Sequence, residues 1–171
     1  MTARFISKAV VPLPNDNTLR AFAAGAPMSA RDIRSLALDL GEAHHSLVAQ
    51  LMQGDTPDLI VMHGQTVLHE PPLSWQLMDP WPVATAFRCR VVTDLRSRSI
   101  TPRGQGAPLT PLPDLALFRD ADAPPTIAQL GRFATFTTPP AAGKCQPPQV
   151  QGIRRGAHPP PLRVPTRPPP A

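Results

Sequence analysis

The sequence predicts an α/β fold over residues 1–140, followed by a disordered proline- and arginine-rich tail over residues 141–171. Two observations predict it. Short apolar runs alternate with helical segments, which is the pattern of a mainly parallel sheet. The overall composition, 42% hydrophobic and 17% charged, is that of a globular protein, but the 25 prolines far exceed the share of an ordinary domain.

The first third of the chain reads as two helices. Asn15 or Asn17 is positioned to cap a short helix that ends at Gly25. Ser29 is positioned to cap a long amphipathic helix with a bend near Gly41. Its apolar residues fall mostly at helical spacing: Ile33, Leu36, Leu40, Leu47, Val48 and Leu51.

Strands and short helices alternate after Pro57. A buried strand is expected at 58–62, a short helix at 82–88, and a second strand at 89–95. A further helix is expected at 111–120, with Pro113 in its first turn. Residues 126–138 read as a strand, a turn at Gly131 and a possible second strand.

The end of the chain has no periodicity. Its arginines, with no acidic residue after Asp122, raise the net charge to +5. Because no aromatic residue follows Phe136, nucleic acid is not an expected partner. The alternative is a non-enzymatic interaction protein, in which Pro165 to Pro168 form a polyproline ligand.

Cysteine and histidine usage bears on location and cofactors. Cys89 and Cys145 read as free thiols of a reducing compartment, and no run has the length of a membrane span. We therefore expect a cytoplasmic protein without a membrane partner. The histidines are not at ligand spacing, so no metal site is expected.

Polar residues follow the predicted strand at 58–62. His63, Gly64, Gln65 and Thr66 lie at its carboxyl end, which is where α/β sheets bind ligands. Glycine allows a backbone to approach a ligand closely, and the other three side chains form hydrogen bonds. A polar turn at the end of an edge strand explains the same residues equally well.

Two further polar segments follow. Arg96, after the second strand, suits a carboxylate or phosphate, although a surface arginine is the more common case. Gly104, Gln105 and Gly106 precede a predicted helix, where backbone N–H groups favour anions, but a plain turn has the same pattern. Four aspartates are candidate bases, and spacing selects none of them: Asp58, Asp79, Asp94 and Asp114.

Taken in order, these segments resemble the anhydro-N-acetylmuramic acid kinases. The resemblance rests on residues 58–72, 75–80, 91–100 and 104–118, and is strongest at His63–Thr66 and Gly104–Pro108. It implies the actin-like (hexokinase and Hsp70) ATPase fold and ATP- and Mg²⁺-dependent ring opening and phosphorylation of 1,6-anhydro-N-acetylmuramic acid in peptidoglycan recycling. It also implies substrate binding by these residues: His63, Gly64, Gln65, Thr66, Arg96, Gly104, Gln105 and Gly106.

The chain departs from the family pattern in several places. We find neither the family's Gly-Thr-Ser phosphate loop nor its Asp-Thr-Gly-Pro-Gly-Asn segment with the catalytic aspartate, and no catalytic residue is assigned. Expected glycines and asparagines are replaced at six positions: Met78, Arg88, Arg103, Arg132, Gln129 and Thr135. Because phosphoryl transfer needs the missing parts, we expect an inactive, truncated fragment that does not bind ATP. The sequence does not indicate an oligomeric state.

Overall fold

The computed structural model describes residues 5–101, 104–118, 125–130, 134–138 and 149–153. The chain divides into two compact units, which we call the N-terminal unit (Arg4–Leu109) and the C-terminal unit (from Thr110 onward). The boundary between the two units falls just before the helix predicted at 111–120, and a single domain over residues 1–140 stays a prediction. Among the helices that the structure describes, none has both the length and the apolarity that a membrane crossing requires.

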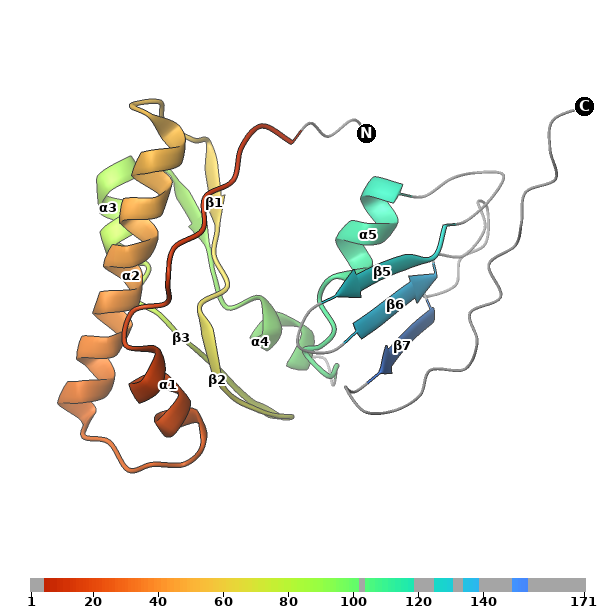
Figure 1. Cartoon of the computed structure of the whole chain (residues 1–171), viewed down its shortest axis with the longest axis horizontal. Helices are drawn as coiled ribbons and strands as arrows, with labels where there is room; N and C mark the ends of the chain where they lie inside the picture. The colour runs from red at the N-terminus through yellow and green to blue at the C-terminus, as the bar shows by residue number, and fades with distance from the viewer. Residues whose placement is uncertain (1–4, 102–103, 119–124, 131–133, 139–148, 154–171) are drawn as a thin grey trace, which may run out of the picture. The chain divides into compact units, whose positions relative to one another are not determined.

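The N-terminal unit combines helices with two separate pairs of strands (Figure 1). In chain order its elements are α1 (Asp16–Ala23), α2 (Ala30–Met52), β1 (Leu59–Val61), β2 (Gln65–Glu70), β3 (Leu73–Leu77), α3 (Trp81–Phe87), β4 (Arg90–Val92) and α4 (Leu95–Ile100). The predicted helices and both predicted strands are therefore present. The α4 helix and the β2–β3 hairpin were not predicted.

The two N-terminal helices begin where the sequence predicts, with different capping. Ser29 caps α2, because its hydroxyl accepts a hydrogen bond from the backbone N–H of Asp32 at 3.2 Å. Asn15 occupies the cap position of α1, but its side chain instead donates to the Asp39 carboxylate at 2.7 Å. Asn15 therefore ties the start of α1 to α2.

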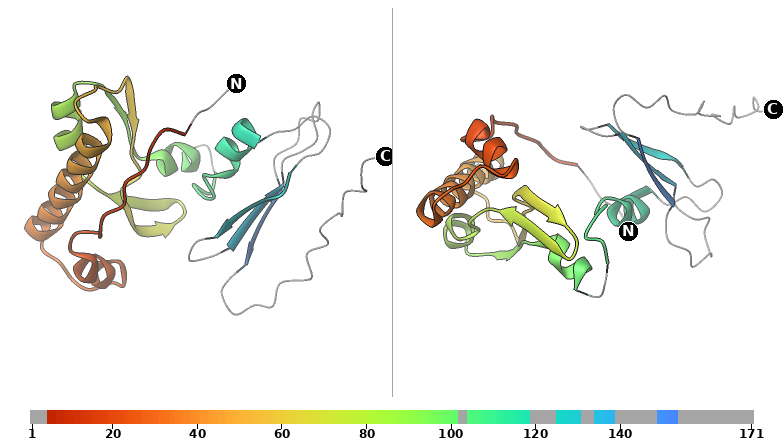
Figure 2. Two further views of the ribbon diagram at one scale, coloured as in Figure 1. Left: turned by 45° about the horizontal axis from the view of Figure 1, so that its top comes forward. Right: turned by 90° about the horizontal axis from the view of Figure 1, so that it is seen from below.

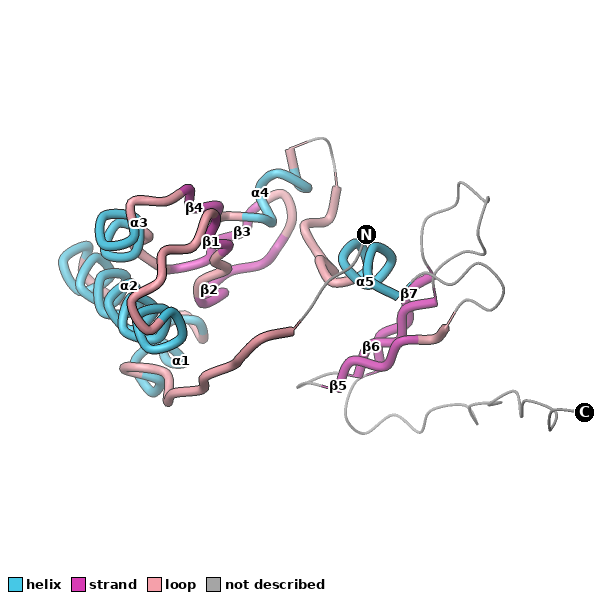
Figure 3. The backbone as a smooth tube through the Cα atoms, turned by 90° about the horizontal axis from the view of Figure 1, so that it is seen from above, coloured by secondary structure: helices cyan, strands magenta, loops and turns pink. Residues whose placement is uncertain are grey.

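The β1 and β4 strands pair in parallel, with Ile60 opposite Val91. The α2 and α3 helices lie on the same side of this pair (Figure 3). Ile60, Met62 and Val83 form the buried cluster beneath them. The strand–helix–strand unit is confirmed, and it brings the carboxyl ends of β1 and β4 together.

The prediction of a mainly parallel sheet is wrong. Among the described strands only β1 and β4 pair in parallel, while β2–β3 and β5–β6–β7 are antiparallel. The reason for β2–β3 is the short connection through Pro71 and Pro72, which joins antiparallel neighbours, whereas a parallel pair needs a crossover of a dozen or more residues.

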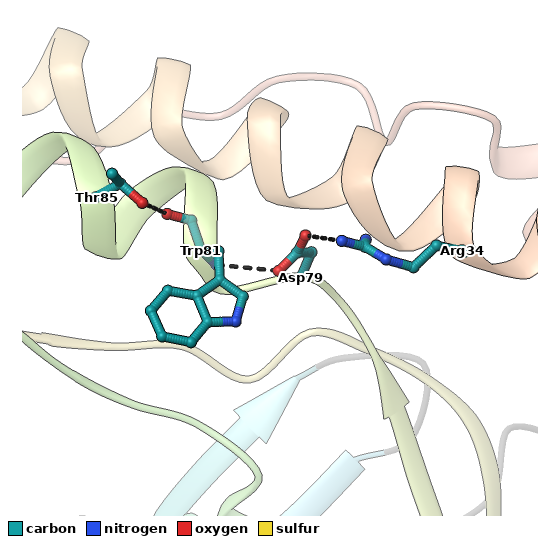
Figure 4. A network of polar contacts seen from close by, with 4 residues as sticks. All are labelled: Arg34, Asp79, Trp81 and Thr85. Atoms are coloured by element: carbon teal, nitrogen blue, oxygen red, sulfur yellow. Dashed lines mark hydrogen bonds and ion pairs between the residues drawn. The ribbon is translucent and has the colours of Figure 1, made fainter.

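Gly41 and Asp79 fix the junction between α2 and α3. A Cβ atom at Gly41 would overlap the Asp79 carbonyl oxygen, and the Asp79 N–H donates to the Ala37 carbonyl at 2.8 Å. The buried Asp79 carboxylate accepts from Arg34 at 2.7 Å and from the Trp81 N–H at 3.1 Å (Figure 4). Gly41 lies within the continuous α2, where it permits this close approach.

In its described residues, the C-terminal unit contains one helix and a three-stranded antiparallel sheet (Figure 2). Its elements are α5 (Pro111–Phe118), β5 (Ile127–Leu130), β6 (Ala134–Thr138) and β7 (Gln149–Ile153). The predicted helix and strands are present. The Gln129 amide donates to the buried Asp114 carboxylate at 2.7 Å, which joins β5 to α5.

The β7 strand lies inside the segment for which the sequence predicts disorder. It pairs with β6, with Val150 opposite Thr137. Composition missed it because a strand that adds to an existing edge is held by backbone hydrogen bonds, which need no apolar periodicity. The prediction of disorder over residues 141–171 is therefore wrong at residues 149–153. Residues 141–148 and 154–171, including the proline-rich ligand motif, lie outside the described part.

Candidate functional site

The site begins at the carboxyl end of β1. The buried Met62 continues the strand, since its N–H donates to the Val92 carbonyl at 2.9 Å, and His63 follows. Gly64 then turns the chain into β2 with φ +75°, a conformation that favours glycine. A Cβ atom there would lie 3.1 Å from both the Leu77 carbonyl oxygen and the Met78 Cβ. Backbone geometry and space therefore both call for glycine at this turn.

Arg96 joins the two strand ends. It lies in α4, shortly after β4, and its Nη1 donates to the Gly106 carbonyl at 2.8 Å. Its Nη2 lies 3.2 Å from His63 Nε2. His63, Arg96 and Gly106, which we call the His63–Arg96 cluster, are thus brought together from three separate parts of the sequence.

The glycine segment packs closely on α4. Gly106 has φ +67°, and a Cβ atom there would lie 2.8 Å from the Ile100 side chain. A Cβ atom at Gly104 would overlap the Ser99 carbonyl oxygen, and the Gly106 N–H donates to the Ser99 hydroxyl at 3.3 Å. Both glycines are therefore needed for the backbone to lie against the helix.

Ser99 is a site residue that the sequence reasoning missed. It stands three residues after Arg96, on the same face of α4, and both side chains bond Gly106. The available signal was this spacing, which becomes visible only when residues 95–100 are read as a helix rather than as a polar loop.

The cluster carries a positive charge without an acidic partner in the described part of the chain. The ion pairs there join Arg20 to Asp16 and Arg34 to Asp79, and Arg96 takes part in neither. Its Nε is buried without a hydrogen-bond partner. Burial lowers the pKa of Arg96 from its usual value, yet an arginine side chain stays charged in proteins.

The same surroundings change the pKa of His63. Burial, and then the neighbouring Arg96 charge, lower the pKa of the His63 imidazole below its ordinary value of 6.5. Its Nδ1 is buried without a hydrogen-bond partner. A neutral imidazole is therefore favoured beside the guanidinium.

The remaining predicted site residues lie around the cluster and make other contacts. Gln65 and Thr66 begin β2 rather than completing a turn, and Gln65 donates weakly to the Thr66 carbonyl at 3.5 Å. Gln105 is exposed. Whether these residues bind a ligand stays a prediction.

The candidate bases separate by burial. Asp79 and Asp114 are buried, and each is hydrogen-bonded within its own unit, whereas Asp58 and Asp94 are exposed. None of the four bonds the His63–Arg96 cluster among the contacts of the described residues. No group of three potential metal ligands forms among the described residues.

Comparison with known proteins gives one consistent result. A family model described as anhydro-N-acetylmuramic acid kinase matches residues 2–143. Three relatives with that name come from Rhodospirillum rubrum, Synechococcus sp. strain CC9605 and Acidiphilium cryptum. They are 38%, 36% and 37% identical over 64%, 77% and 70% of this chain, respectively.

The matched region is only part of these relatives. The chain covers 30%, 37% and 34% of their respective lengths, or about a third of each. The match contains every residue of the His63–Arg96 cluster, and the family model covers well over half of the chain. The chain belongs to the anhydro-N-acetylmuramic acid kinase family.

Proposed function

We propose that the His63–Arg96 cluster binds the acidic sugar for which these relatives are named, 1,6-anhydro-N-acetylmuramic acid. The single observation that carries the proposal is the Arg96 charge. This guanidinium has a backbone carbonyl and an imidazole as partners, and no carboxylate among the described residues. A sugar carboxylate supplies the missing negative charge, and a planar guanidinium binds it with two parallel hydrogen bonds.

The geometry around Arg96 supports a fixed rather than a mobile binding group. The Gly106 carbonyl and the His63 imidazole hold two of its three nitrogens. The Ser99 hydroxyl accepts a hydrogen bond from the Gly106 N–H, which helps to fix the backbone at Gly106. Because the guanidinium is already oriented, less side-chain entropy is lost when a ligand binds.

We further propose that this chain alone does not transfer a phosphoryl group. The family name implies a kinase, which makes ATP the expected phosphate donor. The sequence contains no Gly-rich phosphate loop of the familiar kinds. Phosphoryl transfer depends on such donors, on Mg²⁺ and on an oriented base. The actin-like fold, a role in peptidoglycan recycling and the cytoplasmic location likewise stay predictions.

Calorimetric titration of the full chain with the anhydro sugar tests the binding proposal. Losing a hydrogen bond to a charged group costs about 1.5–3 kcal/mol, so Arg96→Ala is expected to weaken binding by roughly 10- to 100-fold. Arg98→Ala is the matched control, because Arg98 is exposed on the same helix and its loss is expected to leave the affinity unchanged. Equal weakening by both substitutions contradicts the proposed site.

A separate assay tests the proposal about phosphoryl transfer. The full chain is incubated with ATP, Mg²⁺ and the anhydro sugar, and the phosphorylated product is measured. No product is expected, while the Rhodospirillum rubrum relative serves as the positive control. Product formed by this chain would overturn the second proposal and leave the binding proposal intact.

A further inference from the structure

We propose that anion binding at Arg96 is coupled to proton uptake by His63, which makes His63 a specificity-determining residue for acidic ligands. The inference rests on the proposed function, since the same cluster takes the sugar carboxylate. It starts from the 3.2 Å contact between Arg96 Nη2 and His63 Nε2.

The contact fixes the tautomer of the neutral His63 ring. A guanidinium nitrogen only donates hydrogen bonds, so His63 Nε2 must accept. The proton of the neutral ring therefore lies on Nδ1, which is buried and has no hydrogen-bond partner among the described residues. A buried donor without a partner is unfavourable.

Protonation of the His63 ring is opposed by its surroundings. A proton on Nε2 would remove the acceptor and place two positive charges 3.2 Å apart. Among the described residues, Arg96 on α4 is the charged group that acts on His63, and the segment that packs on α4 contributes the Gly106 carbonyl to the cluster. No carboxylate among the described residues compensates a second charge.

A bound carboxylate reverses this balance. Its negative charge screens the repulsion between the two cations and stabilises an imidazolium beside it. Binding therefore raises the proton affinity of His63, and by thermodynamic reciprocity protonation of His63 strengthens carboxylate binding. A neutral sugar of the same shape gains nothing from the proton. The pair therefore selects acids over neutral analogues, most strongly on the acidic side of neutrality.

Nitrogen NMR of the His63 ring in the full chain tests the inference. We expect the proton of the neutral ring on Nδ1 at about pH 8. When sodium lactate, used as a small carboxylate probe, or the anhydro sugar saturates the site, we expect the pKa of His63 to rise by about one unit. A proton on Nε2 overturns the inference, and so does a ligand that binds without moving this pKa. A chain that binds lactate but not the sugar overturns only the proposed function, whereas a chain that binds neither overturns both.

Calorimetry with two variants supplies the second readout. Carboxylate ions stay ionised at about pH 5.5, where we expect affinity at least roughly threefold tighter than at about pH 7.5, with measurable proton uptake. His63→Gln keeps an acceptor for Arg96 but does not titrate, so its affinity is expected to be independent of pH. His69→Gln is the matched control, because His69 contacts Ser74 at 3.0 Å instead of Arg96. Equal proton uptake by His63→Gln and the unmodified chain overturns the inference.

Discussion

Two arginines of the N-terminal unit each bridge two elements, and their partners differ in charge. Arg34 reaches from α2 to the buried Asp79 carboxylate at 2.7 Å. Arg96 reaches from α4 to a neutral imidazole and a carbonyl. The first contact is complete without a ligand, and the second lacks a negative charge. The difference separates a structural junction from the proposed binding site within one small unit.

Gly41→Ala should break the structural junction most severely. The added Cβ would overlap a backbone carbonyl of Asp79, which cannot rotate away as a side chain does. Inserting a methyl group into a closely packed contact costs about 1–3 kcal/mol, and a backbone neighbour places this case at the upper end. Chemical denaturation measures the loss. Glu42→Ala, at the exposed adjacent position, should change the free energy of unfolding by less than about 0.5 kcal/mol.

Asp79→Ala tests the same junction from its polar side. It removes the partner of Arg34 and leaves the Trp81 N–H without its acceptor at the start of α3. We expect the free energy of unfolding to fall by about 2 kcal/mol.

Arg34→Ala separates the two contributions of Asp79. The Arg34 side chain is 63% exposed, so the ion pair alone should contribute less than about 1 kcal/mol. Thermal unfolding of both single variants and of the double variant isolates the coupling. Equal losses from Arg34→Ala and Asp79→Ala would show that the ion pair, rather than the hydrogen bond from the Trp81 N–H, holds the junction.

Arg88→Gly should instead raise the free energy of unfolding. Arg88 ends α3 with φ +50°, at a position where the family resemblance leads to an expected glycine. A left-handed conformation costs a residue with a side chain about 1–2 kcal/mol, and glycine removes this cost. Glycine also makes the unfolded chain more flexible, which offsets part of the benefit, so the free energy of unfolding should rise by about 1 kcal/mol. Arg90→Gly, in the extended β4, should instead destabilise by about 0.5–1 kcal/mol. A loss in both variants would contradict strain at Arg88.

Sequence reasoning anticipated the proximity of the residues in the His63–Arg96 cluster better than it anticipated the structural junction. His63, Arg96 and Gly106 were accessible because each follows a recognisable strand or precedes a helix, and parallel strands bring such ends together. Sequence reasoning treated Asp79 as a candidate base. Its structural role was not visible, because its contact with Arg34 joins residues that lie 45 positions apart in the sequence. The β2–β3 hairpin was missed because Pro71 and Pro72 read as a break, and β7 because pairing at a sheet edge leaves little trace in composition.

The smallest expected effect is on the pH dependence of the free energy of unfolding. It tests, in the absence of any ligand, how His63 responds to its burial beside the Arg96 charge. The His63 pKa is lowered in the folded chain, by burial first and by Arg96 second. The unfolded chain therefore binds more protons below about pH 6.5, and the free energy of unfolding should fall as the pH drops through this value. His63→Gln should lose this part of the pH dependence, and His69→Gln should keep it. Denaturation at a series of pH values measures the difference, and identical slopes in the unmodified chain and His63→Gln would show that folding does not lower the pKa of His63.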